Sequence, residues 1–308
     1  MSETIRTHGT PPGFDELMPE FERLCRVVAK LRSPDGCPWD RQQTMKTIKP
    51  YTLEETYELL EAIDSDDNAA IQEELGDLLL QVVLDAQIAA DEGRFQLTAV
   101  VRQIADKMIR RHPHVFGEAR SISTNEVRRN WYTQKQKEKP ARMSQLEGIP
   151  VAMPELARAA RITARAAAVG YDFPDRRMLF DKLNEELAEL AVELFGSTSI
   201  PHVEATVSTA RLPDSPINDD TIRDRAESEL GDVLFVLANI GRRWGINPEE
   251  ALRKSNAKFS RRFQAIEQAM LSQGKDMSAT SLLEMEEAYQ AAKSREKQHP
   301  TSGSKGNT

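Results

Sequence analysis

The chain has 308 residues, of which 29% are charged and 6% aromatic, and its formal net charge is -8. This acidic balance argues against a general nucleic-acid-binding protein, because such proteins rely on a basic surface. The two cysteines, Cys25 and Cys37, are too few for a disulfide framework or a structural zinc site. The longest apolar stretch, 78–90, is too short to cross a bilayer, and the N-terminus has no continuous apolar signal region. We therefore expect a cytoplasmic protein with neither nucleic acid nor membrane as a partner.

The spacing of apolar residues in the first half is helical throughout, and no segment has the alternating pattern of paired strands. A segment rich in Pro and Gly, a polar turn, Gly93 and Pro113 divide this periodicity into separate helices. The predicted helices cover 15–32, 52–63, 70–91 and 97–111.

The second half repeats this order, with predicted helices over 179–195, 224–244 and 248–271. The last helix of each half also carries the same basic spacing. The residues concerned are Lys107, Arg110 and Arg111 in the first half, and Lys258, Arg261 and Arg262 in the second. Several matching elements in the same order indicate a duplication. We therefore expect an all-α fold built from two tandem repeats.

The halves differ in the connection between their acidic helices. In the first half 15 residues separate Glu58 from Glu74, whereas 39 residues separate Glu189 from Glu229. So long a connection is usually functional or disordered. The predicted organisation is an N-terminal repeat over 1–124, a helical connector over 125–160, a C-terminal repeat over 161–272 with an inserted loop at about 196–223, and an extension over 273–308 whose tail is disordered.

Each half carries two pairs of carboxylates at a spacing that places each pair on one helix face. In the first half these are Glu55 with Glu58 and Glu74 with Asp77. Two antiparallel helices could bring all four together, and such a group persists only when protons or cations neutralise it. Oxygen ligands favour Mg²⁺ or Mn²⁺, and the lack of Glu-x-x-His pairs disfavours a di-iron site. The second half repeats the pattern with Glu186, Glu189, Glu229 and Asp232.

A solvated acidic helix face is the alternative interpretation of each double-glutamate element. Apolar residues surround Glu74 and Asp77 and leave little of that helix surface for water, which favours the metal site. Gly76 and Gly231 lie inside predicted helices, where glycine is unfavourable, so we expect another backbone to approach closely at both positions.

The basic residues that end each repeat could bind phosphate oxygens or form a solvated basic face, and both interpretations stay open. Trp39 precedes the first acidic helix and could stack on a nucleobase or pack into the core. Phe173 lies in the comparable place of the second half, so an aromatic residue recurs there. This recurrence favours a nucleobase pocket.

Several longer motifs make the chain resemble the MazG family of nucleoside triphosphate pyrophosphohydrolases, within the all-α NTP pyrophosphatase superfamily. The resemblance extends from about Phe14 to Leu271. It rests on CPWDRQQTMKTIKPYTLEETYEL at 37–59, ELGDLLLQVV at 74–83, RRHPHVFG at 110–117, VGYDF at 169–173, ELGDVLF at 229–235 and NAKFSRRF at 256–263.

This resemblance implies four-helix-bundle repeats, homodimers, and Mg²⁺-dependent hydrolysis of NTPs or dNTPs to nucleoside monophosphate and pyrophosphate. The implied metal ligands are Glu55, Glu58, Glu74 and Asp77, with Glu186, Glu189, Glu229 and Asp232 in the second half. The implied substrate-binding residues are Lys258, Arg262 and Phe173. The repeated pattern adds Arg261, Lys107, Arg110, Arg111 and Trp39 as further candidates. We expect Glu185, Glu186 and Glu54 to be the catalytic residues, and the second half to be the competent site.

Two other functions compete with this one. In the first, the chain is a catalytically weak regulatory module that binds nucleotide without turnover. Retention of all eight carboxylates favours the enzyme, because a degenerate site would tolerate their loss. In the second, a helical nucleic-acid-binding protein would use Arg128, Arg129 and the Lys-rich connector, but the acidic balance disfavours it.

Overall fold

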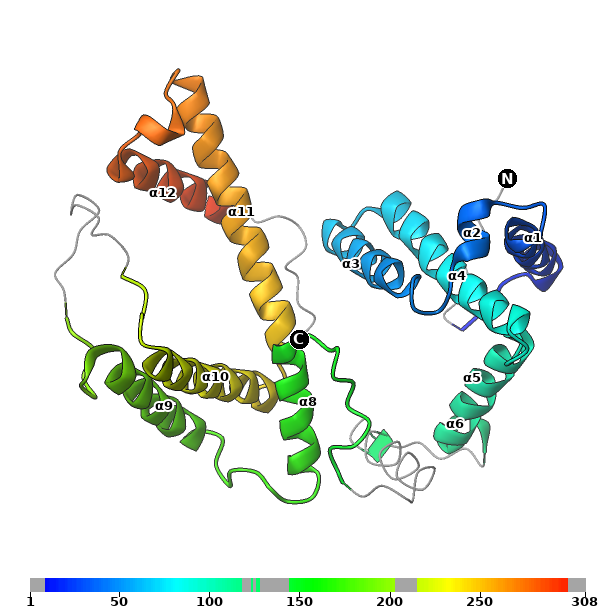
Figure 1. Ribbon diagram of the computed structural model, residues 1–308, viewed down its shortest axis with the longest axis horizontal. Helices are drawn as coiled ribbons and strands as arrows, with labels where there is room; N and C mark the ends of the chain where they lie inside the picture. Colours follow the sequence, from blue (N-terminus) through cyan, green and yellow to red (C-terminus); the bar gives the residue numbers. More distant parts are fainter. Residues whose placement is uncertain (1–8, 118–122, 124–125, 128–143, 203–214, 299–308) are drawn as a thin grey trace. The chain divides into compact units, whose positions relative to one another are not determined.

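A computed structural model describes residues 9–117, 123, 126–127, 144–202 and 215–298. The described residues form helices and connecting segments, with no strand among them, which confirms the all-α fold (Figure 1). The chain divides into two compact units, Met1–Pro140 and Ala141–Thr308. Among the described residues, no helix combines the length and the apolar character that crossing a bilayer requires.

Within residues 9–117, the first unit contains the four helices that the periodicity predicts and two short ones that it does not. The fourth predicted helix has the predicted bounds, and the others begin one to three residues earlier. The helices are α1 (Phe14–Arg32), α2 (Pro38–Gln42), α3 (Lys49–Ser65), α4 (Asn68–Asp91), α5 (Leu97–Arg111) and α6 (Pro113–Phe116).

Helices α3 and α4 pack against each other as an antiparallel hairpin (Figure 1). The turn between them forms because Asp66 adopts the left-handed conformation, with φ of 55°, and ends α3. The next residue, Asp67, caps α4 by accepting hydrogen bonds from the backbone amides of Ala69 and Ala70. Gly93, with φ of 69°, follows the end of α4, as the sequence predicts for a stop signal. This hairpin positions the carboxylates of the first half.

The core of the first unit lies where α1 packs against α4. It consists of Val28 from α1, Ile48 just before α3, and Val83, Leu84 and Ile88 from α4, all at most 4% exposed. Burial of these side chains stabilises the end of the hairpin away from the α3–α4 turn, because their transfer from water is favourable. The carboxylates lie nearer the turn.

The second unit repeats the hairpin with α9 and α10, and α8 packs on α10 as α1 packs on α4. The helices are α8 (Glu155–Ala167), α9 (Met178–Phe195), α10 (Asp220–Arg243), α11 (Pro248–Ser272) and α12 (Leu282–Gln298), with a 3₁₀ turn, η1 (Met277–Ala279). Helix α12 packs against α11 (Figure 1).

Helix α10 begins four residues before its predicted start. The reason is a cap: Asp219 accepts hydrogen bonds from the backbone amides of Thr221 and Ile222, which extends the helix backward. Gly196, with φ of 68°, ends α9. The described parts of the inserted loop are therefore 196–202 and 215–219, and residues 220–223, which were predicted as loop, belong to α10.

The predicted domain boundaries stay predictions. The division between the two units falls inside the predicted connector, and α8 continues across its end at 160. Most of the predicted connector helix lies outside the described residues, as do Arg128 and Arg129. The predicted disordered tail begins near Lys297, which is still helical, and 299–308 also lie outside the described residues.

Candidate functional site

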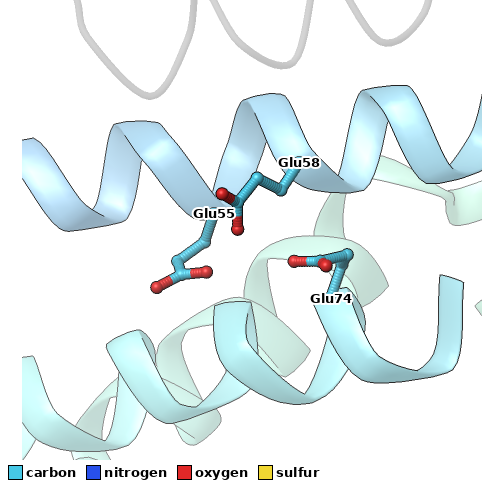
Figure 2. A group of neighbouring side chains, drawn as sticks. All are labelled: Glu55, Glu58 and Glu74. Atoms are coloured by element: carbon cyan, nitrogen blue, oxygen red, sulfur yellow. The ribbon is translucent and has the colours of Figure 1, made fainter. Parts of the chain in front are cut away.

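The α3–α4 hairpin brings three predicted carboxylates together. Glu55 and Glu58 project from α3 and Glu74 projects from α4 into the space between the two helices (Figure 2). One oxygen from each lies within 4.8 Å of the others. We call these three residues the first acidic cluster.

The charges in the first acidic cluster repel one another. Burial, then the charges of Asp77 and Glu58, raise the pKa of Glu55. Burial, then the charges of Glu58 and Asp77, raise the pKa of Glu74. In addition, Oε2 of Glu74 is buried and has no hydrogen-bond partner among the described residues. A cation would satisfy this orphaned oxygen and relieve the repulsion, so the donor set fits a divalent metal ion that prefers oxygen ligands.

The α9–α10 hairpin forms a second group in the same way. Glu186, Glu189 and Glu229 each offer an oxygen within 4.8 Å of the others, and we call them the second acidic cluster. Glu186 is only 5% exposed. A cation already partners it, because Nζ of Lys182 lies 2.7 Å from its Oε1 and 2.8 Å from Oε1 of Glu185.

Lys182 makes the electrostatics of the second acidic cluster different from those of the first. Its hydrogen bonds to Glu185 and Glu186 raise its own pKa, so it stays charged. The pKa of Glu189 is raised by burial and by Glu186 and Glu229, while Lys182 acts in the opposite direction. Within the described residues no basic side chain pairs with the first acidic cluster. The second cluster therefore contains an internal cation that the first lacks.

The predicted ligand roles of Asp77 and Asp232, and the predicted base roles of Glu54 and Glu185, stay predictions. Asp77 is half-buried and Asp232 is exposed, and both lie outside the two groups of mutually close oxygens, although Asp77 is near enough to raise the pKa of Glu55. The candidate bases Glu54 and Glu185 are also exposed and outside these groups. Each hairpin thus gathers three carboxylates and leaves the aspartate at the edge.

The apolar surroundings of Glu74 are also more open than predicted. Leu75, Leu79 and Val82 on α4 are 51%, 43% and 44% exposed. Apart from their chain neighbours and the backbone of their own helix, no described atom would lie within 4 Å of a Cβ at Gly76 or Gly231, so the expected close approach of another backbone is absent from the described part of the chain. The outer faces of both hairpins are apolar and uncovered there.

The basic residues of the second half lie on α11, where α12 packs. The Arg262 guanidinium donates to Glu296 at 2.7 Å and to the Tyr289 hydroxyl at 3.2 Å, and both residues are on α12. The hydrogen bond to Tyr289, and after it the hydrogen bond to Glu296, raise the pKa of Arg262. Arg261 is more exposed and lies 4.0 Å from Glu296, while Lys258 is exposed. Lys107, Arg110 and Arg111 lie on α5 in the first unit.

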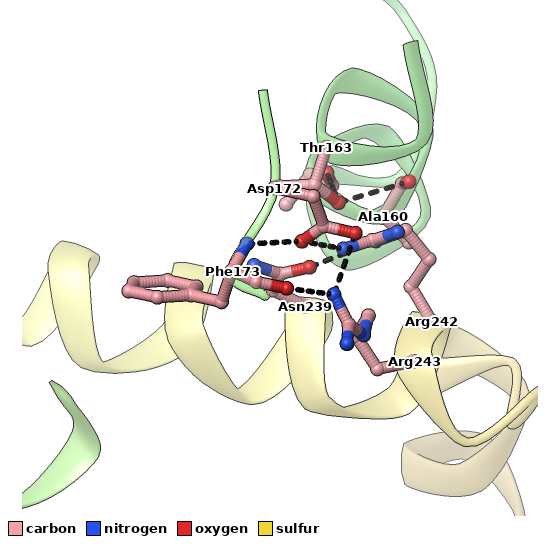
Figure 3. A network of polar contacts seen from close by, with 8 residues as sticks. Ala160, Thr163, Asp172, Phe173, Asn239, Arg242 and Arg243 are labelled. Carbon is pink, nitrogen blue, oxygen red and sulfur yellow. Dashed lines mark hydrogen bonds and ion pairs between the residues drawn. The ribbon is translucent and has the colours of Figure 1, made fainter. Parts of the chain in front are cut away.

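The two predicted aromatic residues have different surroundings. The Trp39 ring packs edge-on against Tyr51 at a centroid distance of 5.6 Å, and Trp39 is 48% exposed. Because Tyr51 stands one turn before Glu55 on α3, Trp39 lies beside that turn. Phe173 is held by its backbone: Arg243 donates to its carbonyl oxygen at 2.7 Å (Figure 3). Arg243 stands fourteen residues after Glu229, roughly 21 Å along α10. The structure therefore does not bring Phe173 into the second acidic cluster.

A polar network fixes the loop that carries Phe173. Asp172 accepts from Arg242 at 2.8 Å and lies 2.7 Å from Arg243, and all three side chains are at most 21% exposed (Figure 3). Burial opposes ionisation of Asp172, but the hydrogen bonds from both arginines outweigh it and lower its pKa. The network attaches the α8–α9 loop to the end of α10.

Two polar residues at the clusters, Lys182 and Gln81, are not among the predicted site residues. Lys182 stands four residues before Glu186, one helical turn, and this i,i+4 spacing was a usable signal. Gln81 is buried on α4 and its Nε2 donates to Oε1 of Glu55 at 3.4 Å. It stands seven residues, two turns, after Glu74, but a lone glutamine in an apolar run gives no comparable signal.

Comparison with known proteins agrees with this geometry. The sequence profile of the MazG nucleotide pyrophosphohydrolase domain matches residues 43–116, which include the first acidic cluster. The nucleoside triphosphate pyrophosphohydrolase of Escherichia coli K12 is 40% identical over 282 residues, 91% of this chain and 99% of that protein. The nucleoside triphosphate pyrophosphohydrolase/pyrophosphatase MazG of Thermotoga maritima is 37% identical over 273 residues, 89% of this chain and 95% of that protein. With two relatives matched over nearly their whole length, the chain belongs to the MazG family.

Proposed function

We propose that the chain hydrolyses nucleoside triphosphates, NTPs or dNTPs, to the nucleoside monophosphate and pyrophosphate with Mg²⁺ as cofactor. The observation that carries this proposal is the pair of three-glutamate groups on matching hairpins, each with its oxygens within 4.8 Å. The names of the E. coli and T. maritima relatives support the same reaction.

The residues that would hold the metal are the two acidic clusters, with Asp77 and Asp232 available at their edges. The orphaned Oε2 of Glu74 supports this role in the first half, because a buried carboxylate oxygen without a donor is unfavourable. Mg²⁺, when bound, would neutralise phosphate charge and lower the pKa of a coordinated water. Mn²⁺ has similar ligand preferences and could replace it.

In the proposed reaction a water oxygen bonds to the α-phosphorus while the bond to the bridging oxygen of the β-phosphate breaks. The electron pair of that bond leaves with pyrophosphate, and a carboxylate accepts the proton of the water. Glu185 and Glu54 are the candidate bases, since each is exposed next to a cluster glutamate. Glu185 also contacts Lys182, which holds it near Glu186.

The positive charges on α11 would bind the phosphates of the substrate. Lys258, Arg261 and Arg262 are the candidates in the second half, and Arg262 would have to exchange its contact with Glu296 for a phosphate. Lys107, Arg110 and Arg111 are the counterparts on α5. Trp39 and Phe173 are the candidate base contacts, and the exposed face of Trp39 near Glu55 supports the first.

The protein is expected to act as a homodimer. Each hairpin supplies only two helices, and its outer face exposes large apolar side chains that a second copy could cover. These are Leu75, Leu79 and Val82 on α4, and Leu230, Leu234 and Phe235 on α10, all at least 39% exposed. Sedimentation equilibrium at micromolar concentration tests this, and a monomer throughout would contradict it.

The reaction is tested by measuring Mg²⁺-dependent pyrophosphate release across a panel of NTPs and dNTPs. Glu186→Gln and Glu55→Gln each remove one ligand charge. The substitution in the catalytically active half should lower kcat/KM on the order of 100-fold. Glu61→Gln on α3 and Glu227→Gln on α10 are matched controls, because both residues are exposed and outside the clusters. Loss with Glu186→Gln alone would assign catalysis to the second half.

Two results would count against the proposal. Release of orthophosphate without pyrophosphate would exclude cleavage at the α-phosphorus, and full activity in both cluster variants would exclude these carboxylates. Nucleotide binding with no turnover in the unmodified chain would favour the regulatory binding module instead.

A further inference from the structure

Gln81 is the only described residue whose side chain donates a hydrogen bond to the first acidic cluster. It projects from α4 two turns beyond Glu74, and its Nε2 lies 3.4 Å from Oε1 of Glu55. The contact is long for a hydrogen bond, but the residue is only 5% exposed, so little water competes for the carboxylate oxygen at this point.

The other end of the same amide is unsatisfied. Oε1 of Gln81 is buried and has no hydrogen-bond partner among the described residues. An ionised carboxylate can only accept, so the amide must present its Nε2 to Glu55 and turn its carbonyl oxygen to where the described residues offer no donor. A buried, half-satisfied amide is unfavourable for folding, and an apolar side chain would serve the core better. Its presence therefore points to a role at the carboxylates.

The second half solves the same problem with different residues. Val236 stands seven residues after Glu229, as Gln81 stands seven after Glu74, and it is buried and apolar. There the ammonium of Lys182 contacts Glu186, from the position four residues before it. The corresponding position before Glu55 is occupied by Tyr51. Each half thus supplies one donor to its leading glutamate, a neutral amide in the first and a cation in the second.

We propose that Gln81 is a positioning residue for metal binding at the first acidic cluster. Its amide holds the Glu55 carboxylate beside Glu58 and Glu74, and because the amide is neutral it leaves the full negative charge of the three glutamates for a divalent cation. Residues that orient metal ligands in this way typically change metal affinity 10- to 100-fold when they are replaced. The inference rests on the proposed function, since it needs the cluster to bind metal.

The test measures binding of Mn²⁺ to the full chain. The electron paramagnetic resonance signal of the free ion reports how much Mn²⁺ stays unbound. Glu186→Gln and Glu229→Gln are present in every sample to weaken the second acidic cluster. Gln81→Met fills a similar volume without a donor and should weaken Mn²⁺ binding 10- to 100-fold. Gln81→Val, which introduces the side chain of the second half, should do the same. The matched control is Gln87→Met on the same helix, whose amide donates to Asp91 outside the cluster.

A second readout separates positioning from a merely structural role. Without metal, Gln81→Met should melt at the same or a higher temperature than its parent, because it removes an orphaned buried oxygen. A structural role would instead lower both the melting temperature and the affinity. Unchanged Mn²⁺ affinity in both Gln81 variants, or an equal loss in Gln87→Met, overturns the positioning role. A parent that binds no Mn²⁺ overturns the metal site of the first half as well, which distinguishes the two failures.

Discussion

Two aspartates on α4 are in opposite electrostatic situations. Oδ1 of Asp85 is buried without a hydrogen-bond partner among the described residues, and burial raises the pKa of its carboxyl. Asp91, at the end of the same helix, accepts from Nε of Arg32 at 2.7 Å, and that guanidinium side chain is only 8% exposed. The same substitution, Asp to Asn, should therefore stabilise the first unit at Asp85 and destabilise it at Asp91.

The magnitudes follow from the partners. A buried polar atom without a partner costs about 1–3 kcal/mol, and the charged form costs more than the neutral one. Asp85→Asn keeps the shape and removes the charge, so we expect the opening free energy of α4 to rise by about 1–2 kcal/mol at pH 7. Asp91→Asn leaves Arg32 with backbone carbonyls as acceptors but no counter-ion, and should lower that free energy by about 1–3 kcal/mol.

The pH dependence identifies the cause at Asp85. A raised folded-state pKa means that the folded state holds the proton more tightly than the unfolded state. The free-energy cost of burying the Asp85 carboxylate is therefore present above the folded pKa and disappears as the pH falls toward the unfolded pKa of about 3.9. The advantage of Asp85→Asn should accordingly be largest at pH 7 and shrink toward zero near pH 4.

Hydrogen exchange of α4 peptides, read by mass spectrometry, measures this free energy locally. A change of about 1–2 kcal/mol corresponds to roughly 5- to 30-fold slower exchange in Asp85→Asn, with each variant compared with its parent at the same pH. Peptides from α10 serve as an internal reference in the other unit. Equal or faster α4 exchange in Asp85→Asn at pH 7, or a gain that does not change with pH, would refute the reasoning.

Two further predictions concern the second unit. Glu296→Gln should lower the KM for nucleoside triphosphates roughly 3- to 10-fold with kcat unchanged, because Arg262 loses its charged partner on α12. Steady-state pyrophosphate release checks this against Glu286→Gln on the same helix, and an unchanged KM would contradict it. Asp172→Asn should lower the melting temperature of the unit by roughly 4–8 °C, since Arg242 and Arg243 lose a shared carboxylate worth about 2 kcal/mol. Because the pKa of Asp172 is lowered, this stabilisation is present at neutral pH and is lost as the pH falls below about 3.9. The melting temperatures of Asp172→Asn and its parent should therefore converge in acid. Equal melting temperatures at pH 7 would count against the prediction.

The helices and the carboxylate groups were predictable because both depend on local spacing. Apolar periodicity and stop signals define α5 to the residue, and Gly93 ends its predicted helix. Carboxylates three residues apart share a helix face, and a short turn at Asp66 and Asp67 makes the two helices antiparallel. These rules suffice to bring Glu55, Glu58 and Glu74 together.

The periodicity of a helix does not show what each of its faces contacts. The expectations that proved wrong are wrong for this reason. The apolar run around Glu74 predicted burial, but Leu75 and Leu79 are half-exposed on the outer face of the hairpin. In the part of the chain that the structure describes, Gly76 faces open space rather than another backbone. Arg262 carries the expected charge but pairs with Glu296 on α12, which a sequence pattern cannot foresee because Glu296 lies 34 residues further along the chain.

The difference between the clusters bears on which half acts on the substrate. Nucleoside triphosphates are polyanions, and the first acidic cluster offers them carboxylates whose pKa values, at Glu55 and Glu74, are raised first by burial and then by the neighbouring negative charges. The second acidic cluster already contains the Lys182 ammonium, which partly neutralises Glu186 and stays charged. A triphosphate therefore meets less repulsion at the second cluster for the same number of bound cations. The Lys182 ammonium thus favours the second half as the proposed catalytic site, whereas the first half, with its neutral Gln81 amide, is better suited to holding a metal ion alone.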